Sequence, residues 1–273
     1  MTVATAYPLR LDCASRASTE AGLAAVFSCT VEDLRRFVAD PAKEAFFEAN
    51  WSKLPAFEDW FYAQACEQLG TPTLPTELCW FHGTRVPAGT TFAEGILPLG
   101  QGIGRLRDAI LSTLDDVAAR AAVGAAFDRQ HGKTMHFRNK VDHDIHWGPY
   151  AILVREVADH ASAIGQHDYL AMPEIIDDLC EEVRIADGLD IRAAFEQGWA
   201  PAMVKFWAPC EESSGRYAVA TALCYLRDCA LRGRPHMGAV WCFDGENVAV
   251  APERILGIEW VTEAHISAGR RGG

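Results

Sequence analysis

Apolar side chains recur about every three to four residues over long parts of this chain, which is the spacing of helices with one buried face. The longest such run covers residues 103–130 and predicts a single amphipathic helix. Shorter apolar runs predict strands. The other predicted helices cover residues 1–70, 92–96, 173–179 and 216–231, and the predicted strands cover 78–82, 148–154, 203–207, 238–243, 247–251 and 255–261.

This order of elements predicts the fold class. Strands scattered among helices, with a strand-rich C-terminal part, favour an α+β fold over a doubly wound one. Gly100, Gly102 and Gly104 do not form a dinucleotide-binding fingerprint, because their spacing is wrong and no strand precedes them. The turn-rich segment 71–76 marks a boundary. We therefore expect an N-terminal helical region over residues 1–75, a main domain over 76–265 and a disordered tail over 266–273.

The N-terminal region is rich in aromatic residues. Thr30, followed by Glu32 and Asp33, is typical of the start of a helix. The aromatic side chains of this region are Phe37, Phe46, Phe47, Trp51, Phe57, Trp60, Phe61 and Tyr62. Such a density implies burial. Because only Lys43 and Lys53 interleave with the rings, we favour a packed helical cap over a surface that binds a partner or stacks on bases.

Composition and charge narrow the class of protein. The chain has 273 residues, 49% of them apolar and 23% charged, which suits a globular protein with a sizeable core. Its net charge of −12 argues against nonspecific binding to nucleic acid, although residues 105–140 are locally basic. No apolar run is long enough for a transmembrane helix, and the first residues do not resemble a secretory signal. We expect no membrane partner.

The cysteines and histidines indicate neither disulfides nor a metal. Nine scattered cysteines without a Cys-x-x-Cys pair are typical of reduced thiols in a cytoplasmic protein. Cys224 and Cys229 share one apolar helix and are expected in the core. Four histidines gather at positions 131, 136, 143 and 146. On a strand or loop, His143 and His146 would not converge on a metal, and no cysteine or acidic triad stands at a suitable spacing, so we expect no metal site.

The segment Cys79-Trp-Phe-His-Gly-Thr-Arg85 carries the most distinctive chemistry of the chain. Its apolar start predicts a strand that delivers His82 to its exposed end. Gly83 then lets a ligand approach the backbone without a side chain in the way. A histidine that merely precedes a turn is the simpler interpretation of a bare His-Gly pair.

A second segment follows seven residues later and reads Phe92-Ala-Glu-Gly-Ile-Leu-Pro-Leu99. It places Phe92 and Ile96 one helical turn apart, and Gly95 helps to end the short helix that we expect here.

Together the two segments resemble the first motif of the ADP-ribosyltransferase superfamily, in the His-Tyr-Glu branch that includes poly(ADP-ribose) polymerases and diphtheria-type toxins. In that branch a strand ends in His-Gly-(Ser/Thr), a helix follows, and a Gly-(Ile/Leu) step leads out of it. The resemblance implies a split β-sheet core, an enzyme that uses NAD as co-substrate, and residues 103–130 as a long helical insertion. The matching residues are His82, Gly83, Thr84, Arg85, Gly95, Ile96 and Leu97.

The resemblance also implies an aromatic residue on a second strand and an acid before a later strand. Tyr150 stands at the head of a predicted strand, and Glu246 stands directly before the predicted strand 247–251. Glu253 is the reserve candidate for the acid. Without the resemblance, Tyr150 is a strand-end residue that packs on the core. Glu246 is then a solvated hairpin acid, since the Asp-Gly pair before it is a strong turn signal.

The chemistry of the superfamily asks for these residue types. Breaking the bond between nicotinamide and ribose builds positive charge on the sugar, as in glycoside hydrolysis. A carboxylate such as Glu246 stabilises that charge, and the ring of Tyr150 can stack on the nicotinamide. The resemblance implies that His82 hydrogen-bonds the ribose and that the backbone of Gly83 binds the carboxamide. Beside them in the NAD-binding set stand Thr84 and Arg85, whose guanidinium is a candidate partner for the pyrophosphate.

We therefore expect an NAD-dependent mono-ADP-ribosyltransferase that acts on an unidentified macromolecular acceptor, protein or nucleic acid, with NAD glycohydrolase activity when water is the acceptor. A transferase of RNA 2′-phosphate is less favoured, because no basic groove is evident. The alternative from another class is a non-catalytic member of this fold that binds a partner, or serves as an immunity module, through its N-terminal face. A thiol hydrolase based on Cys79 or Cys242 lacks a recognisable nucleophile motif.

Overall fold

The computed structural model describes residues 8–129 and 133–262. These residues fold into two compact units, which are interleaved along the sequence. The first unit runs up to Phe81 and resumes at Ile152–His160 and Trp207–Cys242. The second unit holds His82–Ala151 and Ala161–Phe206 and starts again at Phe243.

The strands form one sheet with the order β5-β3-β2-β4-β6, and β1 pairs with β2 in parallel. Antiparallel pairing joins β2 to β3, where Phe81 lies opposite Ile152, and joins β4 to β6. The structure is thus mixed helix and strand with a mainly antiparallel sheet, which is compatible with the predicted α+β class. The strands are β1 Arg10–Leu11, β2 Glu77–Pro87, β3 Tyr150–Ile152, β4 Trp199–Pro209, β5 Cys242–Asp244 and β6 Ile255–Trp260.

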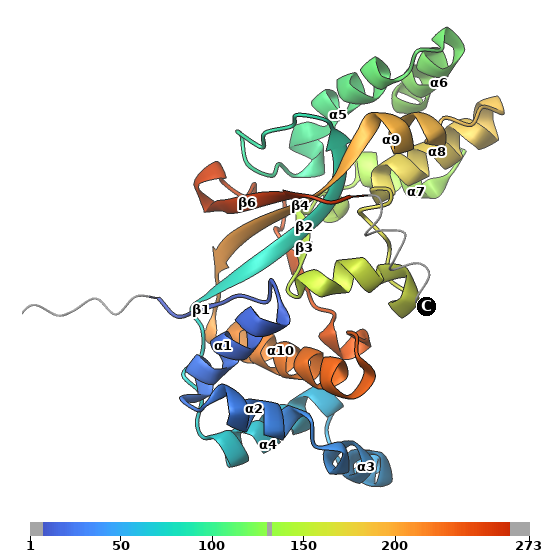
Figure 1. Cartoon of the computed structure of the whole chain (residues 1–273). Coiled ribbons are helices and arrows are strands. Elements are labelled where there is room, and N and C mark those ends of the chain that lie inside the picture. The colour runs from blue at the N-terminus through green and yellow to red at the C-terminus, as the bar shows by residue number, and fades with distance from the viewer. Residues whose placement is uncertain (1–7, 130–132, 263–273) are drawn as a thin grey trace, which may run out of the picture. The chain divides into compact units, whose positions relative to one another are not determined.

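The first unit packs its N-terminal helices against α10 (Figure 1). The helix start predicted at Thr30 is confirmed, because Thr30 Oγ1 accepts the backbone N–H of Asp33 at 3.1 Å. Cys224 and Cys229 are buried in α10, as expected. The helices of this unit are α1 Arg16–Phe27, α2 Val31–Val38, α3 Pro41–Asn50, α4 Phe57–Leu69 and α10 Glu212–Arg232.

Most of the aromatic side chains of this unit stack on one another, as a packed cap requires. The rings of Phe37 and Phe61 lie 4.9 Å apart, and Phe57 and Trp60 pack beside them. Trp51 departs from this pattern, since 69% of its surface is exposed.

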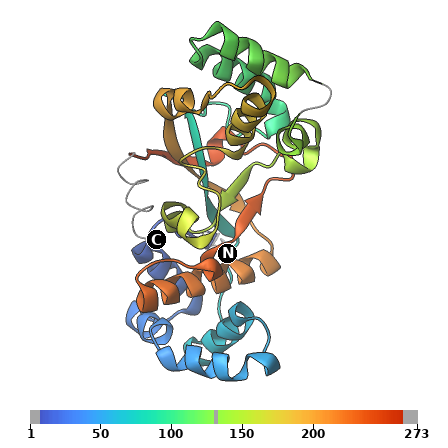
Figure 2. The same ribbon diagram turned by 90° about the vertical axis from the view of Figure 1, so that its right-hand side faces the viewer.

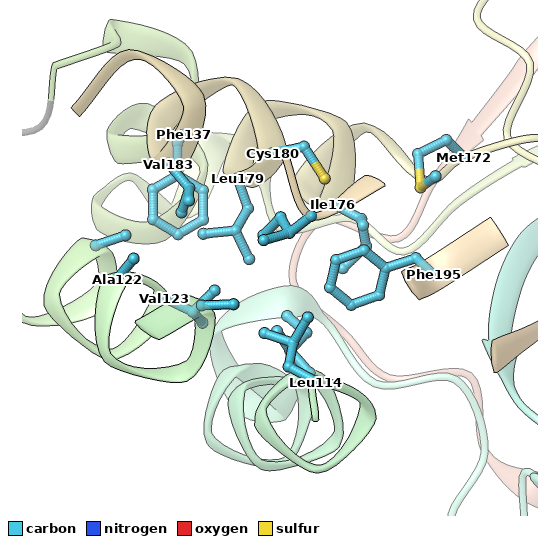
Figure 3. Close-up of a cluster of buried hydrophobic side chains, with 14 of the residues drawn as sticks. Leu114, Ala122, Val123, Phe137, Met172, Ile176, Leu179, Cys180, Val183 and Phe195 are labelled. Atoms are coloured by element: carbon cyan, nitrogen blue, oxygen red, sulfur yellow. The ribbon is translucent and has the colours of Figure 1, made fainter. Parts of the chain in front are cut away.

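The second unit carries a group of helices with its own apolar core. Figure 2 shows these helices in green to gold, and Figure 3 shows side chains from several of them pointing toward one another. Leu114, Val123, Phe137, Leu179 and Phe195 are among the buried members. The helices are α5 Leu99–Thr113, α6 Val117–Asp128, α7 Met135–Asp142, α8 Glu174–Asp187 and α9 Arg192–Gly198.

The prediction of a single helix over residues 103–130 is wrong, because the helix is interrupted between α5 and α6. Leu114 takes an extended conformation and is buried among the neighbouring helices. Asp116 then starts α6 by accepting the N–H of Ala118 at 2.8 Å. An aspartate at this position favours a new helix start over an unbroken helix.

Two predicted strands of the C-terminal part are also corrected. The strand predicted over 238–243 starts only at Cys242, where β5 begins, and a 3₁₀ turn at Met237–Ala239 precedes it. The strand predicted over 247–251 is reduced to one isolated bridge between Val250 and Ile96, followed by a 3₁₀ turn at Pro252–Arg254. No strand begins at Asn247, because Glu246 and Asn247 both adopt left-handed backbone conformations and the chain turns there.

Several other expectations concern the chain as a whole. The division at residue 75 stays a prediction, because the N-terminal helices share their unit with α10. The predicted tail 266–273 lies outside the described residues. All nine cysteines are free thiols. Within residues 8–129 and 133–262, no helix combines the length and the apolar character that crossing a bilayer requires.

Candidate active site

His82 lies within strand β2 rather than at its end, which corrects the predicted strand 78–82. The strand continues to Pro87, and within this second half Arg85 is buried while its neighbours are half-buried. The Nδ1 atom of His82 lies 2.7 Å from the backbone oxygen of Tyr150. A carbonyl oxygen can only accept, so Nδ1 carries the proton and donates it. In the neutral ring, Nε2 is then left as an acceptor.

The protonation state of His82 follows from its surroundings. Burial by neighbouring atoms lowers its pKa below the ordinary value, and the hydrogen bond to the Tyr150 carbonyl opposes this shift. The imidazole is therefore neutral at pH 7. A neutral ring that accepts at Nε2 suits a hydroxyl donor such as a ribose 2′- or 3′-OH.

Tyr150 begins the neighbouring strand β3, and 37% of its surface is exposed. Its phenol donates to the backbone oxygen of Ile145 at 3.0 Å. Partial burial raises its pKa, and the charges of Asp244 and Glu174 raise it further. The phenol therefore stays uncharged at neutral pH.

Glu246 lies in the turn after β5, and its side chain is exposed. The turn is hydrogen-bonded to the segment that leads into Tyr150. The N–H of Gly245 donates to the oxygen of Pro149 at 2.9 Å, and the N–H of Asn247 donates to the oxygen of Gly148 at 2.8 Å. Glu253 is exposed in the 3₁₀ turn at Pro252–Arg254.

The three predicted site positions are thus brought onto neighbouring backbone segments. The His82 ring is bonded to the Tyr150 backbone, and the residues on either side of Glu246 are bonded to the two residues before Tyr150. The sheet order β5-β3-β2 reflects the same neighbourhood. The arrangement links a neutral imidazole, an uncharged phenol and an exposed carboxylate.

Gly83 and Thr84 follow His82 along β2 and are half-buried. A methyl group added at Gly83 would stand 3.6 Å from Tyr169 Cβ and 3.6 Å from Met203 Cε. The side of Gly83 that its missing side chain leaves open is therefore covered by this chain's own residues. Sequence reasoning missed Tyr169, which lies in a turn-rich segment with His167 and whose ring meets the His167 ring edge-on at 4.7 Å.

Arg85 does not lie open to a ligand, because only 2% of its surface is exposed. Its Nη1 donates to the backbone oxygen of Glu196, near the C-terminal end of helix α9, at 3.2 Å. The pyrophosphate contact that the sequence suggested would require this guanidinium to leave its buried position. The geometry instead favours a structural role for Arg85, between β2 and α9.

The short helix predicted over 92–96 is wrong, because this segment forms a turn that ends at the Ile96 bridge. Gly95 has a φ of +83°, and a Cβ there would lie 1.9 Å from the backbone oxygen of Val250. Ile96 exchanges both of its backbone hydrogen bonds with Val250, each at 3.0 Å. The second half of the motif therefore packs against the chain that follows Glu246.

Two thiols, Cys79 and Cys242, bear on the alternative of a thiol hydrolase. Cys79 is buried in β2. Cys242 is exposed, but the atoms packed around it partly desolvate its thiol and raise its pKa above the ordinary value, which disfavours the thiolate that a nucleophile needs. In the part of the chain that the structure describes, no three histidine, cysteine or acidic side chains are grouped to hold a metal ion. His131 lies outside that part.

A separate cleft of about 710 Å³ lies among the N-terminal helices of the first unit. Asp33 pairs with Arg36 and Asp40 pairs with Lys43, so its charged side chains neutralise one another. Its lining comprises Ser28, Cys29, Asp33, Arg36, Phe37, Asp40, Lys43, Gln68 and Leu69.

No protein-family model matches the chain, no curated protein matches it, and no solved structure matches it.

Proposed function

We propose that this protein is an NAD-dependent ADP-ribosyltransferase whose site is built from His82, Tyr150 and Glu246. The observation that carries the proposal is the backbone connection of these three positions. Each lies on a different segment of the chain, and the hydrogen bonds at Gly148, Pro149 and Tyr150 hold the segments side by side. This sheet neighbourhood supports the split-sheet core that the resemblance implies.

The side chains have protonation states that suit this reaction. Neutral His82 offers Nε2 to a ribose hydroxyl, and the uncharged ring of Tyr150 offers an apolar face to nicotinamide. Glu246 supplies the carboxylate that stabilises positive charge on the ribose as the bond to nicotinamide breaks. The electrons of that bond leave with nicotinamide, and the acceptor nucleophile bonds to the ribose carbon and releases its proton.

The test is the release of nicotinamide from NAD by the full chain, measured for the wild type and for Glu246→Gln. We expect the variant to turn over NAD about 100-fold more slowly, because the amide cannot stabilise the developing charge. Glu253→Gln is the matched control, since Glu253 is also exposed and lies in the next turn. It should retain the wild-type rate, and equal loss in both variants would contradict the assignment of Glu246.

The second candidate function is a binding module that uses the N-terminal helices. The cleft of the first unit and the exposed ring of Trp51 favour it. The same assay separates the two functions, because a protein of this kind would release no nicotinamide in the wild type or in either variant.

A further inference from the structure

The turn that carries Glu246 is held by a neighbouring side chain. Asp244 is the last residue of β5, and its Oδ1 accepts the backbone N–H of Glu246 at 2.9 Å. An aspartate that bonds the backbone two residues ahead fixes the direction in which the chain turns.

This turn needs such support because of its backbone conformation. Glu246 has a φ of +49° and Asn247 a φ of +66°. Asparagine adopts the left-handed region readily, whereas glutamate rarely does. Two consecutive left-handed residues therefore persist only where neighbouring groups hold them, and the φ of Glu246 sets where its Cβ and carboxylate point.

The turn is also fixed against the segment before Tyr150. Two backbone hydrogen bonds join the turn to Gly148 and Pro149. Gly245 also packs closely against Pro149, so that a side chain would have no room there. A Cβ at Gly245 would lie 2.5 Å from Pro149 Cδ. The base of the turn is therefore rigid, and the N–H of Val248 closes the turn on the oxygen of Gly245 at 2.8 Å. Within this closed turn, the bond from the N–H of Glu246 to Asp244 is the side-chain contact that further fixes the direction of Glu246.

We infer that Asp244 is a positioning residue, which aims the carboxylate of Glu246 at the bond between nicotinamide and ribose. This inference rests on the proposed function. The carboxylate of Asp244 also lies near enough to Tyr150 to disfavour ionisation of the phenol. Asp244 itself touches neither the sugar nor the leaving group in this role.

The experiment compares Asp244→Ala with Asp244→Asn in steady-state nicotinamide release. Alanine removes the acceptor, and we expect kcat to fall about 10- to 100-fold, since a small misplacement of a reacting group has an effect of this size. Asparagine keeps an oxygen that accepts the same N–H, so we expect kcat within about threefold of the wild type. KM for NAD should stay within about twofold in both variants, because binding does not depend on the aim of Glu246.

A matched control separates positioning from loss of structure. Asp190 makes the same kind of bond, accepting the N–H of Arg192 at 3.1 Å in the exposed segment that leads into α9. Asp190→Ala should leave kcat unchanged. In Asp244→Ala the backbone bonds of Gly245, Asn247 and Val248 still hold the turn, and water can replace Asp244 as partner of the exposed Glu246 N–H. The midpoint of thermal unfolding should therefore stay close to that of the wild type. Amide exchange at Glu246 should become faster in Asp244→Ala alone.

Each other outcome overturns a definite claim. If Glu246→Gln loses activity while Asp244→Ala keeps it, the positioning role is wrong and the proposed function stands. If Asp244→Asn falls as far as Asp244→Ala, the charge of Asp244 acts rather than its hydrogen bond, and the positioning role is again wrong. If the wild type releases no nicotinamide, or Glu246→Gln matches it, the proposed function fails, and with it the reaction for which Asp244 would aim Glu246.

Discussion

At the scale of a single side chain, the hydrogen bond of His82 determines both how the ring packs in the fold and which of its nitrogen atoms can accept a hydrogen bond. Nδ1 is committed to the Tyr150 carbonyl, so the free lone pair lies on Nε2. Protonation would remove that lone pair and place a charge where burial disfavours it. The neutral imidazole is therefore both the form that the folded state prefers and the form that the proposed site uses.

This coupling predicts how stability depends on pH. The pKa of His82 is lowered in the folded state. When the pH falls below the ordinary histidine pKa, the unfolded chain therefore binds a proton at His82 more readily than the folded chain does. The free energy of unfolding should therefore fall as the pH drops from 7 toward 5. We expect a smaller fall in His82→Gln, whose amide can still donate to the Tyr150 carbonyl but does not titrate. Urea unfolding of both proteins at the two pH values measures the difference, and equal falls would contradict the neutral state of His82.

At the scale of the element, most helices and strands could be predicted from their apolar spacing, and the errors lie at the breaks. The start of α8 and the presence of α10 and β4 are confirmed. The helix break at Asp116 and the left-handed pair Glu246 and Asn247 depend on single capping and turning residues within otherwise regular patterns. The spacing of apolar residues does not reveal where single capping or turning residues interrupt an element.

Gly95 gives a test at this scale. Gly95→Ala should lower the free energy of unfolding by more than about 1 kcal/mol, because its φ is positive and its Cβ would meet the Val250 oxygen. Gly104 is the matched control. It lies within α5 with nothing near its missing Cβ, so Gly104→Ala should raise stability by about 0.5–1 kcal/mol. Urea denaturation measures both. Similar effects in the two variants would mean that the bridge between Ile96 and Val250 does not constrain Gly95.

At the scale of the whole molecule, the parts of the site differ in how far sequence could reach them. The residue types and their order His82, Tyr150, Glu246 are readable along the chain. Their proximity follows from the sheet order and from hydrogen bonds at Gly148 and Pro149, which no local pattern contains. The cover that Tyr169 forms over Gly83 was missed for the same reason, because the two are distant in sequence.

Charge is also organised at this scale, and it bears on the acceptor. In the described part of the locally basic stretch 105–140, acids pair with most of the cations. The ion pairs are Arg105 with Glu94, Arg107 with Asp128, Arg129 with Glu182 and Asp187, Arg138 with Asp142, and Lys140 with Glu174 and Asp178. With a net charge of −12, these pairs leave little attraction for a phosphate backbone.

We therefore expect no nonspecific binding to DNA. Fluorescence anisotropy of a labelled duplex of about 20 base pairs should show no saturation up to about 100 µM protein at low salt, where charge attraction is strongest. The matched variant Glu94→Gln with Asp128→Asn releases Arg105 and Arg107 from their pairs. If pairing is what suppresses binding, this variant should bind measurably and lose the duplex as salt is added. Salt-sensitive binding by the wild type would instead show that these cations remain available, and would favour a nucleic acid as the acceptor.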